Sequence, residues 1–283
     1  MRPTAPTISL LALSLASVLW PSHGMAQETA APGSEATSLD TVVVTGTPKG
    51  RSQKDAPFAI SVLSETTLDR AAPTSSVEML RSVPGFSAEP SGGRGGGQNI
   101  FVRGLPSGGW IFVQYQEDGL TLFDEPQESF FNVDTLFSLD MMTERLEVVR
   151  GGTSPLFATN APGGTVNAIT RRGTMTPEGS ARLTAGSNGL WRADAYSAGP
   201  LSENVLYAVG GHFRQDDGLR RPGFTANDGG QLRASLTFLL GNAVLDVDAK
   251  LLNDRTAFYT PIPLADPRDP SRSLEAFIDP LEG

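Results

Sequence analysis

Two stretches decide the fold of this chain: LDTVVVTGTPKG (Leu39–Gly50) and MTERLEVVRGGTSPLFATNAPGGTVNAITRRG (Met142–Gly173). The first stretch has three valines in a row between threonines, and β-branched residues favour an extended backbone. Such a run can pair its backbone with the sheet edge of a partner protein. The local sequence equally allows it to be an edge strand of the domain that follows. The second stretch has two apolar-alternating runs around a Gly- and Pro-rich loop, which predicts two strands of a compact sheet.

Residues 1–26 have the pattern of an export signal. Arg2 supplies a basic start, residues 8–20 form an apolar core, and small residues stand at Gly24 and Ala26. This pattern predicts a secretory signal peptide that is cleaved after Ala26. The apolar core is shorter than the roughly 20 residues that a membrane-spanning helix needs. We therefore expect any membrane crossing by this chain to use β-strands.

Composition narrows the classes of function. The chain has 22 basic and 31 acidic residues, a formal charge of −9 and no basic run, which argues against nucleic-acid binding. It has no cysteine, which excludes disulfides and thiolate metal sites. After signal removal His212 is the one histidine left, and the Gly-rich residues 92–97 lack the spacing of a phosphate loop. We therefore expect no metal site, no cofactor and no enzymatic activity.

The mature chain divides into three parts. Residues 27–55 are expected to be a flexible tether, because residues 27–39 are small, polar and acidic without apolar periodicity, and the tether carries the β-prone run at 40–47. Residues 56–173 read as one small α+β domain, whose Ser87–Asn99 segment we expect to be a mobile loop. Within it we predict strands at 58–63, 99–103, 111–116, 144–150 and 164–170, and short helices at 66–70 and 75–81.

From residue 174 the pattern changes to five successive alternating strands. In the clearest run, Leu245 and Val247 fall on one face and Asp246, Asp248 and Lys250 on the other. Apolar residues outside and charges inside are expected of a transmembrane β-barrel with a polar lumen. A soluble sandwich alternates equally well, so the export signal and the preceding domain decide for the barrel.

The two opening stretches, in this order, resemble the TonB box and the end of the plug domain of TonB-dependent outer-membrane receptors. The resemblance runs from about Leu39 to Gly173, and the later strands fit the start of the barrel. It implies an α+β plug domain at 56–173, followed by the first antiparallel strands of a transmembrane β-barrel at 174–283. Plugged barrels have about 22 strands, so we expect the barrel to be incomplete and the chain to be the N-terminal part of a receptor.

The resemblance also implies a function, which is energy-coupled uptake of a bulky ligand across the outer membrane of a Gram-negative cell. A ferric siderophore is the commonest ligand in the family. The periplasmic protein TonB is the implied partner of residues 40–47, through Asp40, Thr41, Val42, Val43, Val44, Thr45 and Gly46. The alternatives are an uncoupled surface-binding or structural outer-membrane protein, a non-functional truncated receptor and a soluble periplasmic binding protein.

Further site residues follow from the order of the plug loops in the family. The apical loops would offer Arg94 and Gln98 as polar ligand contacts and four aromatic platforms, although the last two could also form a local core: Trp110, Phe123, Phe130 and Phe131. Four charged residues are candidates for plug–barrel ion pairs, since buried charges need partners: Arg103, Glu147, Arg150 and Arg171. Four glycines have structural roles: Gly104, Gly151, Gly163 and Gly164.

Overall fold

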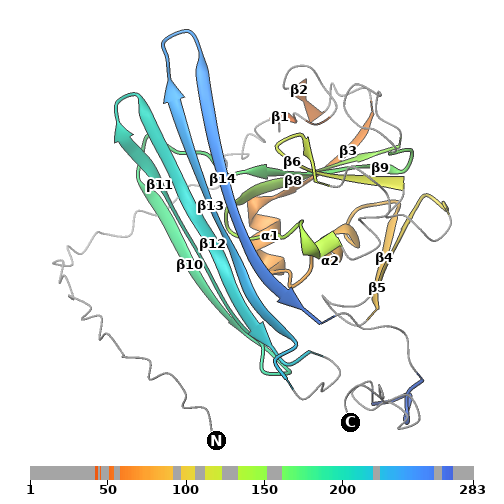
Figure 1. Cartoon of the computed structure of the whole chain (residues 1–283). Coiled ribbons are helices and arrows are strands. Elements are labelled where there is room, and N and C mark those ends of the chain that lie inside the picture. The colour runs from red at the N-terminus through yellow and green to blue at the C-terminus, as the bar shows by residue number, and fades with distance from the viewer. Residues whose placement is uncertain are drawn as a thin grey trace, which may run out of the picture. The chain divides into compact units, whose positions relative to one another are not determined.

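The structure is a computed structural model that describes residues 42–43, 45, 51–53, 58–91, 97–105, 112–122, 133–151, 161–218, 224–257 and 263–269. The chain separates into Met1–Leu39, which lies outside the described residues, and Asp40–Gly283. The expected export signal and most of the expected tether therefore lie outside the described residues. Everything that follows concerns the second unit (Figure 1).

The first half of this unit is a small α/β domain, called here the mixed domain. Its sheet has the strand order β3-β8-β9-β6-β7, with β6 parallel to β9 and the other pairs antiparallel. The strands are β3 (Ala59–Ser64), β6 (Val113–Glu117), β7 (Leu120–Thr121), β8 (Thr143–Arg150) and β9 (Gly164–Thr170). The helices are α1 (Glu65–Ala71), α2 (Ser76–Leu80) and the 3₁₀ turn η4 (Val133–Thr135). The α+β expectation for this region is confirmed.

The core of the mixed domain lies on one face of this sheet. Period-two alternation along β8 puts Leu146 and Val148 on that face, where they pack with the buried Val77 and Leu80 of α2. Ser75 caps α2, because its side chain accepts a hydrogen bond from the Val77 amide. The same alternation turns Glu147 to the other face of the sheet.

A second hairpin corrects one prediction. Strand β4 (Phe86–Ser91) pairs antiparallel with β5 (Gly97–Val102), so the expected mobile loop over 87–99 was wrong for both of its arms. The arms are ordered because Phe86, Ala88 and Ile100 are buried in the core of the mixed domain. The Gly- and Pro-rich composition concealed this alternation, and residues 92–96 lie outside the described residues.

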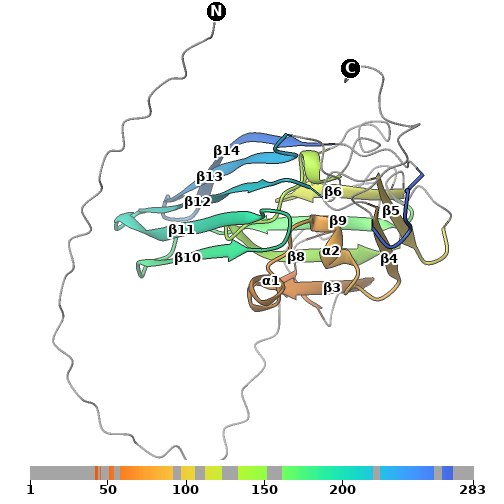
Figure 2. The ribbon, with the colours of Figure 1, turned by 90° about the horizontal axis from the view of Figure 1, so that it is seen from below.

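The second half of the unit is a five-stranded antiparallel sheet in sequence order, called here the wall (Figures 1 and 2). The five expected strands are confirmed. They are β10 (Glu178–Ala185), β11 (Trp191–Ser202), β12 (Val205–Asp216), β13 (Asn227–Leu239) and β14 (Val244–Thr256).

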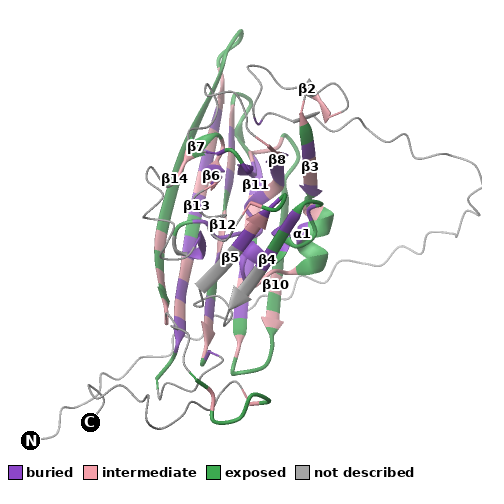
Figure 3. Cartoon of the chain, turned by 90° about the vertical axis from the view of Figure 1, so that its right-hand side faces the viewer, coloured by how far each residue is buried: buried purple, intermediate pink, exposed green. Residues whose placement is uncertain are grey.

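The two faces of the wall differ in chemistry. Polar side chains such as Arg192, His212 and Arg233 are buried against the mixed domain (Figure 3). The opposite face carries large exposed apolar side chains: Leu183, Trp191, Val209, Phe213, Leu232, Leu245, Val247 and Leu251. The wall therefore has a polar inner face and an apolar outer face, as the alternation predicted.

Candidate functional site

Thr45 connects the expected partner-binding segment to the mixed domain. Its amide and its hydroxyl both donate to Oε2 of Glu147, at 2.7 and 2.6 Å. The Thr45 hydroxyl also accepts a hydrogen bond of 2.9 Å from Nδ2 of Asn167 on β9. Glu147 and Asn167 are neighbours in the β8–β9 register, so one polar spot on the sheet holds Thr45.

This contact docks the segment on the face of the sheet opposite to the core. Glu147 is fully buried, and its other carboxylate oxygen accepts from Nε of Arg145 at 2.9 Å. A buried carboxylate needs such donors, so the loss of Thr45 from this spot carries a free-energy cost. Just before Thr45, β1 (Val42–Val43) pairs with β2 (Arg51–Ser52). Asp40, Thr41, Val44 and Gly46 lie outside the described residues.

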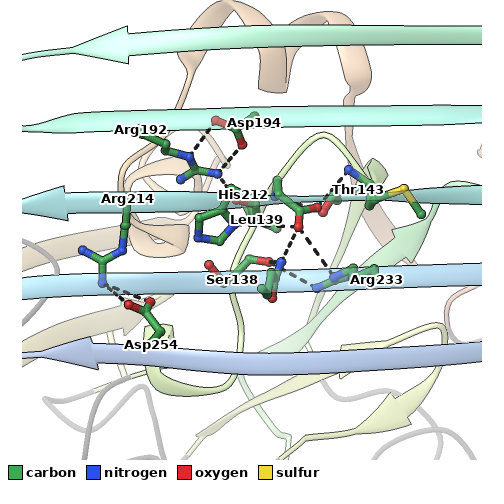
Figure 4. A network of polar contacts seen from close by, with 12 residues as sticks. Ser138, Leu139, Thr143, Arg192, Asp194, His212, Arg214, Arg233 and Asp254 are labelled. Atoms are coloured by element: carbon green, nitrogen blue, oxygen red, sulfur yellow. Dashed lines mark hydrogen bonds and ion pairs between the residues drawn. The ribbon is translucent and has the colours of Figure 1, made fainter. Parts of the chain in front are cut away.

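The mixed domain contacts the wall through a short segment before β8, called here the anchor segment (Leu136–Met141). Its backbone carbonyls accept hydrogen bonds from long side chains of the wall and of the linker to it (Figure 4). The donors are Lys250 to Leu136 O (2.8 Å), Gln231 to Ser138 O (2.9 Å), Arg192 to Leu139 O (2.8 Å) and Arg171 to Met141 O (3.2 Å). The anchor segment is thus held by its main chain, on three strands of the wall.

Asp140 adds a buried charge at the centre of the anchor segment. Its Oδ2 accepts from Nε2 of Gln231 at 2.6 Å and lies 3.8 Å from Nδ1 of His212 and 3.9 Å from Nε of Arg233. Burial by itself would raise the pKa of Asp140. Hydrogen bonding with His212 and Gln231 and the charge of Arg233 have the opposite and larger effect, so the pKa is lowered to about 2. Asp140 is therefore an anion at any physiological pH.

A second contact lies at the turn between β6 and β7. Glu117 accepts hydrogen bonds from Arg233 and Lys250 of the wall, while Arg172 forms an ion pair of 3.5 Å with Asp118 and another with Asp248. A cavity of about 200 Å³ opens beside these charges. The contact of this turn with the wall was not expected from the sequence.

Arg171 fixes the junction between the mixed domain and the wall. It forms ion pairs with Glu65 of α1 (2.5 Å) and Glu178 of β10 (3.3 Å), and its guanidinium lies 4.0 Å from the centre of the Tyr196 ring. Among the four charged candidates for contacts between the two parts, this residue has the expected position.

The other three charged candidates contact the mixed domain itself. Glu147 binds Thr45 and Arg145, as described above. Arg150 donates to Pro84 O (3.2 Å), and the Arg103 amide donates to Gly85 O (2.9 Å). These contacts differ from the ion pairs with the wall that the sequence suggested.

The four expected structural glycines lie where the backbone conformation or close packing disfavours other residues. Gly104 and Gly151 have φ of +77° and +94°, in the region that favours glycine. A Cβ on Gly163 would lie 3.0 Å from Phe112 O, and one on Gly164 would lie 2.3 Å from Val149 O. Glycine is therefore required at Gly164 by close approach of the backbone.

Five of the six residues that we expect to contact the ligand lie outside the described residues: Arg94, Trp110, Phe123, Phe130 and Phe131. The sixth, Gln98, is described only as part of β5. In the described parts of the chain, no three His, Asp or Glu side chains gather as metal ligands would. No helix in those parts is long and apolar enough to cross a membrane.

Comparison with known proteins identifies the mixed domain. Residues 52–165 match the family described as the TonB-dependent receptor plug domain. The vitamin B12 transporter BtuB of Vibrio vulnificus is 28% identical over 211 residues, which cover 74% of this chain and 32% of that protein. The hemin receptor of Yersinia enterocolitica is 30% identical over 200 residues, covering 69% of this chain and 26% of that protein. This chain thus spans about a third or less of the length of these relatives.

Solved structures share the fold. The ferripyoverdine receptor of the outer membrane of Pseudomonas aeruginosa matches with a TM-score of 0.60 at 22% identity, over 74% of this chain and 27% of that one. The alcaligin receptor FauA of Bordetella pertussis matches with a TM-score of 0.57 at 19% identity, over 74% and 34%. The chain therefore belongs to the TonB-dependent outer-membrane receptors, with a plug domain at residues 52–165 and strands of a barrel in β10–β14.

Proposed function

We propose that this protein takes part in TonB-dependent, energy-coupled uptake of a bulky ligand across the outer membrane. The observation that carries the proposal is the docking of Thr45 on Glu147. A β-prone segment held by a few polar contacts can leave its place at a modest cost, since hydrogen bonds to a charged group contribute about 1.5–3 kcal/mol each. The rest of the plug domain is bound to the wall through many more contacts.

A ferric siderophore is the ligand class that we propose. The relatives include proteins named as ferric-pyoverdine, ferrichrome and ferrioxamine receptors, beside those named for hemin and vitamin B12. Ligand contacts would come from the apical loops of the plug, as expected from the sequence. One of the expected contact residues, Gln98, lies on β5, which forms a hairpin with β4.

The coupling step begins at residues 40–46. TonB adds a strand to this segment, and main-chain hydrogen bonds provide its affinity. For the strand to form, Thr45 has to give up its hydrogen bonds with Glu147 and Asn167. Ligand binding at the apical loops would favour the released state, and pulling by TonB would then remodel the plug domain.

The outer face of the wall supports a location in the outer membrane. Aromatic side chains flank its apolar residues toward both ends of the strands, with Trp191 and Phe213 in contact at one end (ring centres 5.3 Å apart). Tyr207 and Phe238 lie toward the other end. Aromatic residues at both borders of an apolar band are typical of transmembrane barrel strands.

Deletion of residues 40–47 tests the coupling. We expect cells that carry the deletion to bind the ligand at their surface as before and to lose its uptake, because TonB has no strand to pair with. Uptake and surface binding are measured with a radioactive iron complex of the siderophore that the wild type accepts. Unchanged uptake would contradict coupling and favour the uncoupled surface-binding protein.

A further inference from the structure

Two cations of the wall stand directly opposite each other on neighbouring strands. Arg233 of β13 and Lys250 of β14 are partners in the strand register. Both point toward the plug domain, since both donate to its acceptors. Like charges in this arrangement repel each other and destabilise the pair of strands. An anion between them removes this repulsion.

A carboxylate of the plug domain fills that role in this state. Oε1 of Glu117 accepts from Nη2 of Arg233 at 2.5 Å and from Nζ of Lys250 at 2.7 Å. Two carbonyls of the anchor segment complete the cluster, with Ser138 O at 3.2 Å from Arg233 and Leu136 O at 2.8 Å from Lys250. All of these acceptors belong to the plug domain.

The other inward-facing arginines of the wall differ in this respect. Arg192 forms an ion pair of 2.7 Å with Asp194, and Arg214 forms one of 3.0 Å with Asp254. Both of these carboxylates belong to the wall, so they stay with their arginines whatever the plug domain does. Arg233 and Lys250, in contrast, share Glu117, and Arg233 also lies 3.9 Å from Asp140. Both of these acids belong to the plug domain, so a displaced plug domain leaves the cation pair in need of another anion.

The cavity beside the pair gives an incoming group room. It measures about 200 Å³, and Glu117, Arg233 and Lys250 line it together with the apolar Leu120 and Leu122. Two more carboxylates, Asp118 and Asp248, also line it, and both form ion pairs with Arg172. A cavity of this size accommodates a carboxylate, catecholate or phosphate group, although not a whole siderophore.

We propose that Arg233 and Lys250 form an oxyanion-binding site that Glu117 occupies while the plug domain is in place. When Glu117 moves, the site takes a carboxylate, catecholate or phosphate group of the transported ligand. Glu117 and the ligand then compete for the same two cations. That the anion belongs to a transported ligand rests on the proposed function. That the two cations bind an anion does not rest on it.

Removal of the resident carboxylate tests the site. Citrate is titrated by calorimetry into detergent-solubilised wild type, Glu117→Gln and the triple variant Glu117→Gln/Arg233→Gln/Lys250→Gln. We expect Glu117→Gln to bind citrate roughly 10- to 100-fold more tightly than the wild type, a factor that corresponds to about 1.4–2.7 kcal/mol, the range of a charge-assisted hydrogen bond. The triple variant should return to the level of the wild type. No gain in Glu117→Gln, or an equal gain in the triple variant, would overturn the proposal.

Two further variants guard against trivial outcomes. Glu117→Gln/Arg255→Gln is a charge control, because it removes a positive charge of β14 that lies on the outer face instead of in the proposed site. It should bind citrate like Glu117→Gln. Thermal melting establishes that each variant is folded. If Glu117→Gln is not folded, Glu117→Asp takes its place, because the shorter side chain keeps the charge but reaches the cations less well. It should give a smaller gain, and the absence of any gain would count against the site.

Uptake separates this proposal from the proposed function. In the wild-type background, Arg233→Gln/Lys250→Gln should lower the uptake of a trianionic ferric tricatecholate several-fold more than that of a neutral ferric trihydroxamate. Equal losses for both complexes contradict a role of the site in transport. If neither complex enters even the wild type, the proposed function fails for these ligands, and the citrate titration still decides on the site.

Discussion

Thr45 and Glu147 are 102 residues apart in the chain, yet their contact is the most consequential one at the scale of single residues. The carboxylate is fully buried and binds both the amide and the hydroxyl of Thr45. Because the amide is a main-chain group, any residue except proline at position 45 retains half of this contact. The retention of the segment therefore depends more on Glu147 than on Thr45.

Substitution of Glu147 should release the segment. We expect Glu147→Gln to make residues 42–45 more mobile, since a neutral amide is a weaker acceptor and hydrogen bonds to charged groups contribute about 1.5–3 kcal/mol. The chain has no cysteine, so Val43→Cys provides a unique site for a nitroxide spin label. Sharper lines in the electron paramagnetic resonance spectrum report the release. Glu144→Gln on the exposed part of the same strand is the matched control, and identical spectra for both variants would contradict the role of Glu147.

Asp140 gives the plug–wall contact a pH dependence. Its pKa in the folded protein is lowered to about 2, so its stabilising effect is complete above the pKa of about 3.9 of an unfolded aspartate and is lost as the pH falls toward 2. We expect the melting temperature of the wild type to fall between about pH 4 and pH 2 more steeply than that of Asp140→Asn. Parallel curves over this interval would show that Asp140 is not coupled to folding.

At the scale of secondary structure, simple rules account for most elements. Ser75 caps α2, and period-two alternation places the strands of the wall and of the plug domain. The hairpin of β4 and β5 was missed because glycines and a proline interrupt its apolar pattern. Each arm nevertheless buries an apolar side chain, Phe86 on β4 and Ile100 on β5. Composition is thus a poor guide where two short arms are stabilised by burial in a shared core.

Gly164 tests how tightly β8 and β9 approach each other. A Cβ at this position would lie 2.3 Å from the Val149 carbonyl oxygen, and the φ of +151° is one that other residues rarely adopt. We expect Gly164→Ala to lower the free energy of unfolding by about 1–3 kcal/mol, as for other strained backbone positions. Gly186→Ala is the control, since its Cβ would meet only the end of the flexible Leu190 side chain, at 3.1 Å. Equal denaturant midpoints for the two variants would refute the steric argument.

At the scale of the whole molecule, we propose that the apolar outer face of the wall contacts lipid. Val209 lies on this face of β12 between the aromatic side chains at its two ends, whereas Gln215 lies near the end of the same strand. We expect Val209→Arg to cost up to about 2–4 kcal/mol of membrane insertion and Gln215→Arg about 0–1 kcal/mol, because the cost of a charge grows with depth. The amount of receptor in washed outer membranes measures this. If both variants insert equally, this face does not contact lipid.

The fold and the site differ in how far the sequence predicted them. The five strands of the wall and the helices of the plug domain follow local patterns of burial and capping, which neighbouring residues determine. The anchor segment has no such pattern, since its contacts with Arg192, Gln231 and Lys250 use backbone carbonyls that every residue has. The inward charges on the wall were visible in the sequence as interruptions of apolar strands, but their partners were not.

The sequence by itself determined the strands of the wall, the cap of α2 and the polar and apolar faces of the wall, because each depends on neighbours along the chain. Only the tertiary structure decided that Thr45 docks on Glu147 and that Glu117 lies between Arg233 and Lys250. Those contacts join residues that are 102, 116 and 133 positions apart. Electrostatic attraction and hydrogen bonding act over a few ångströms in space, so partners of this kind become known only when the folded chain brings them together.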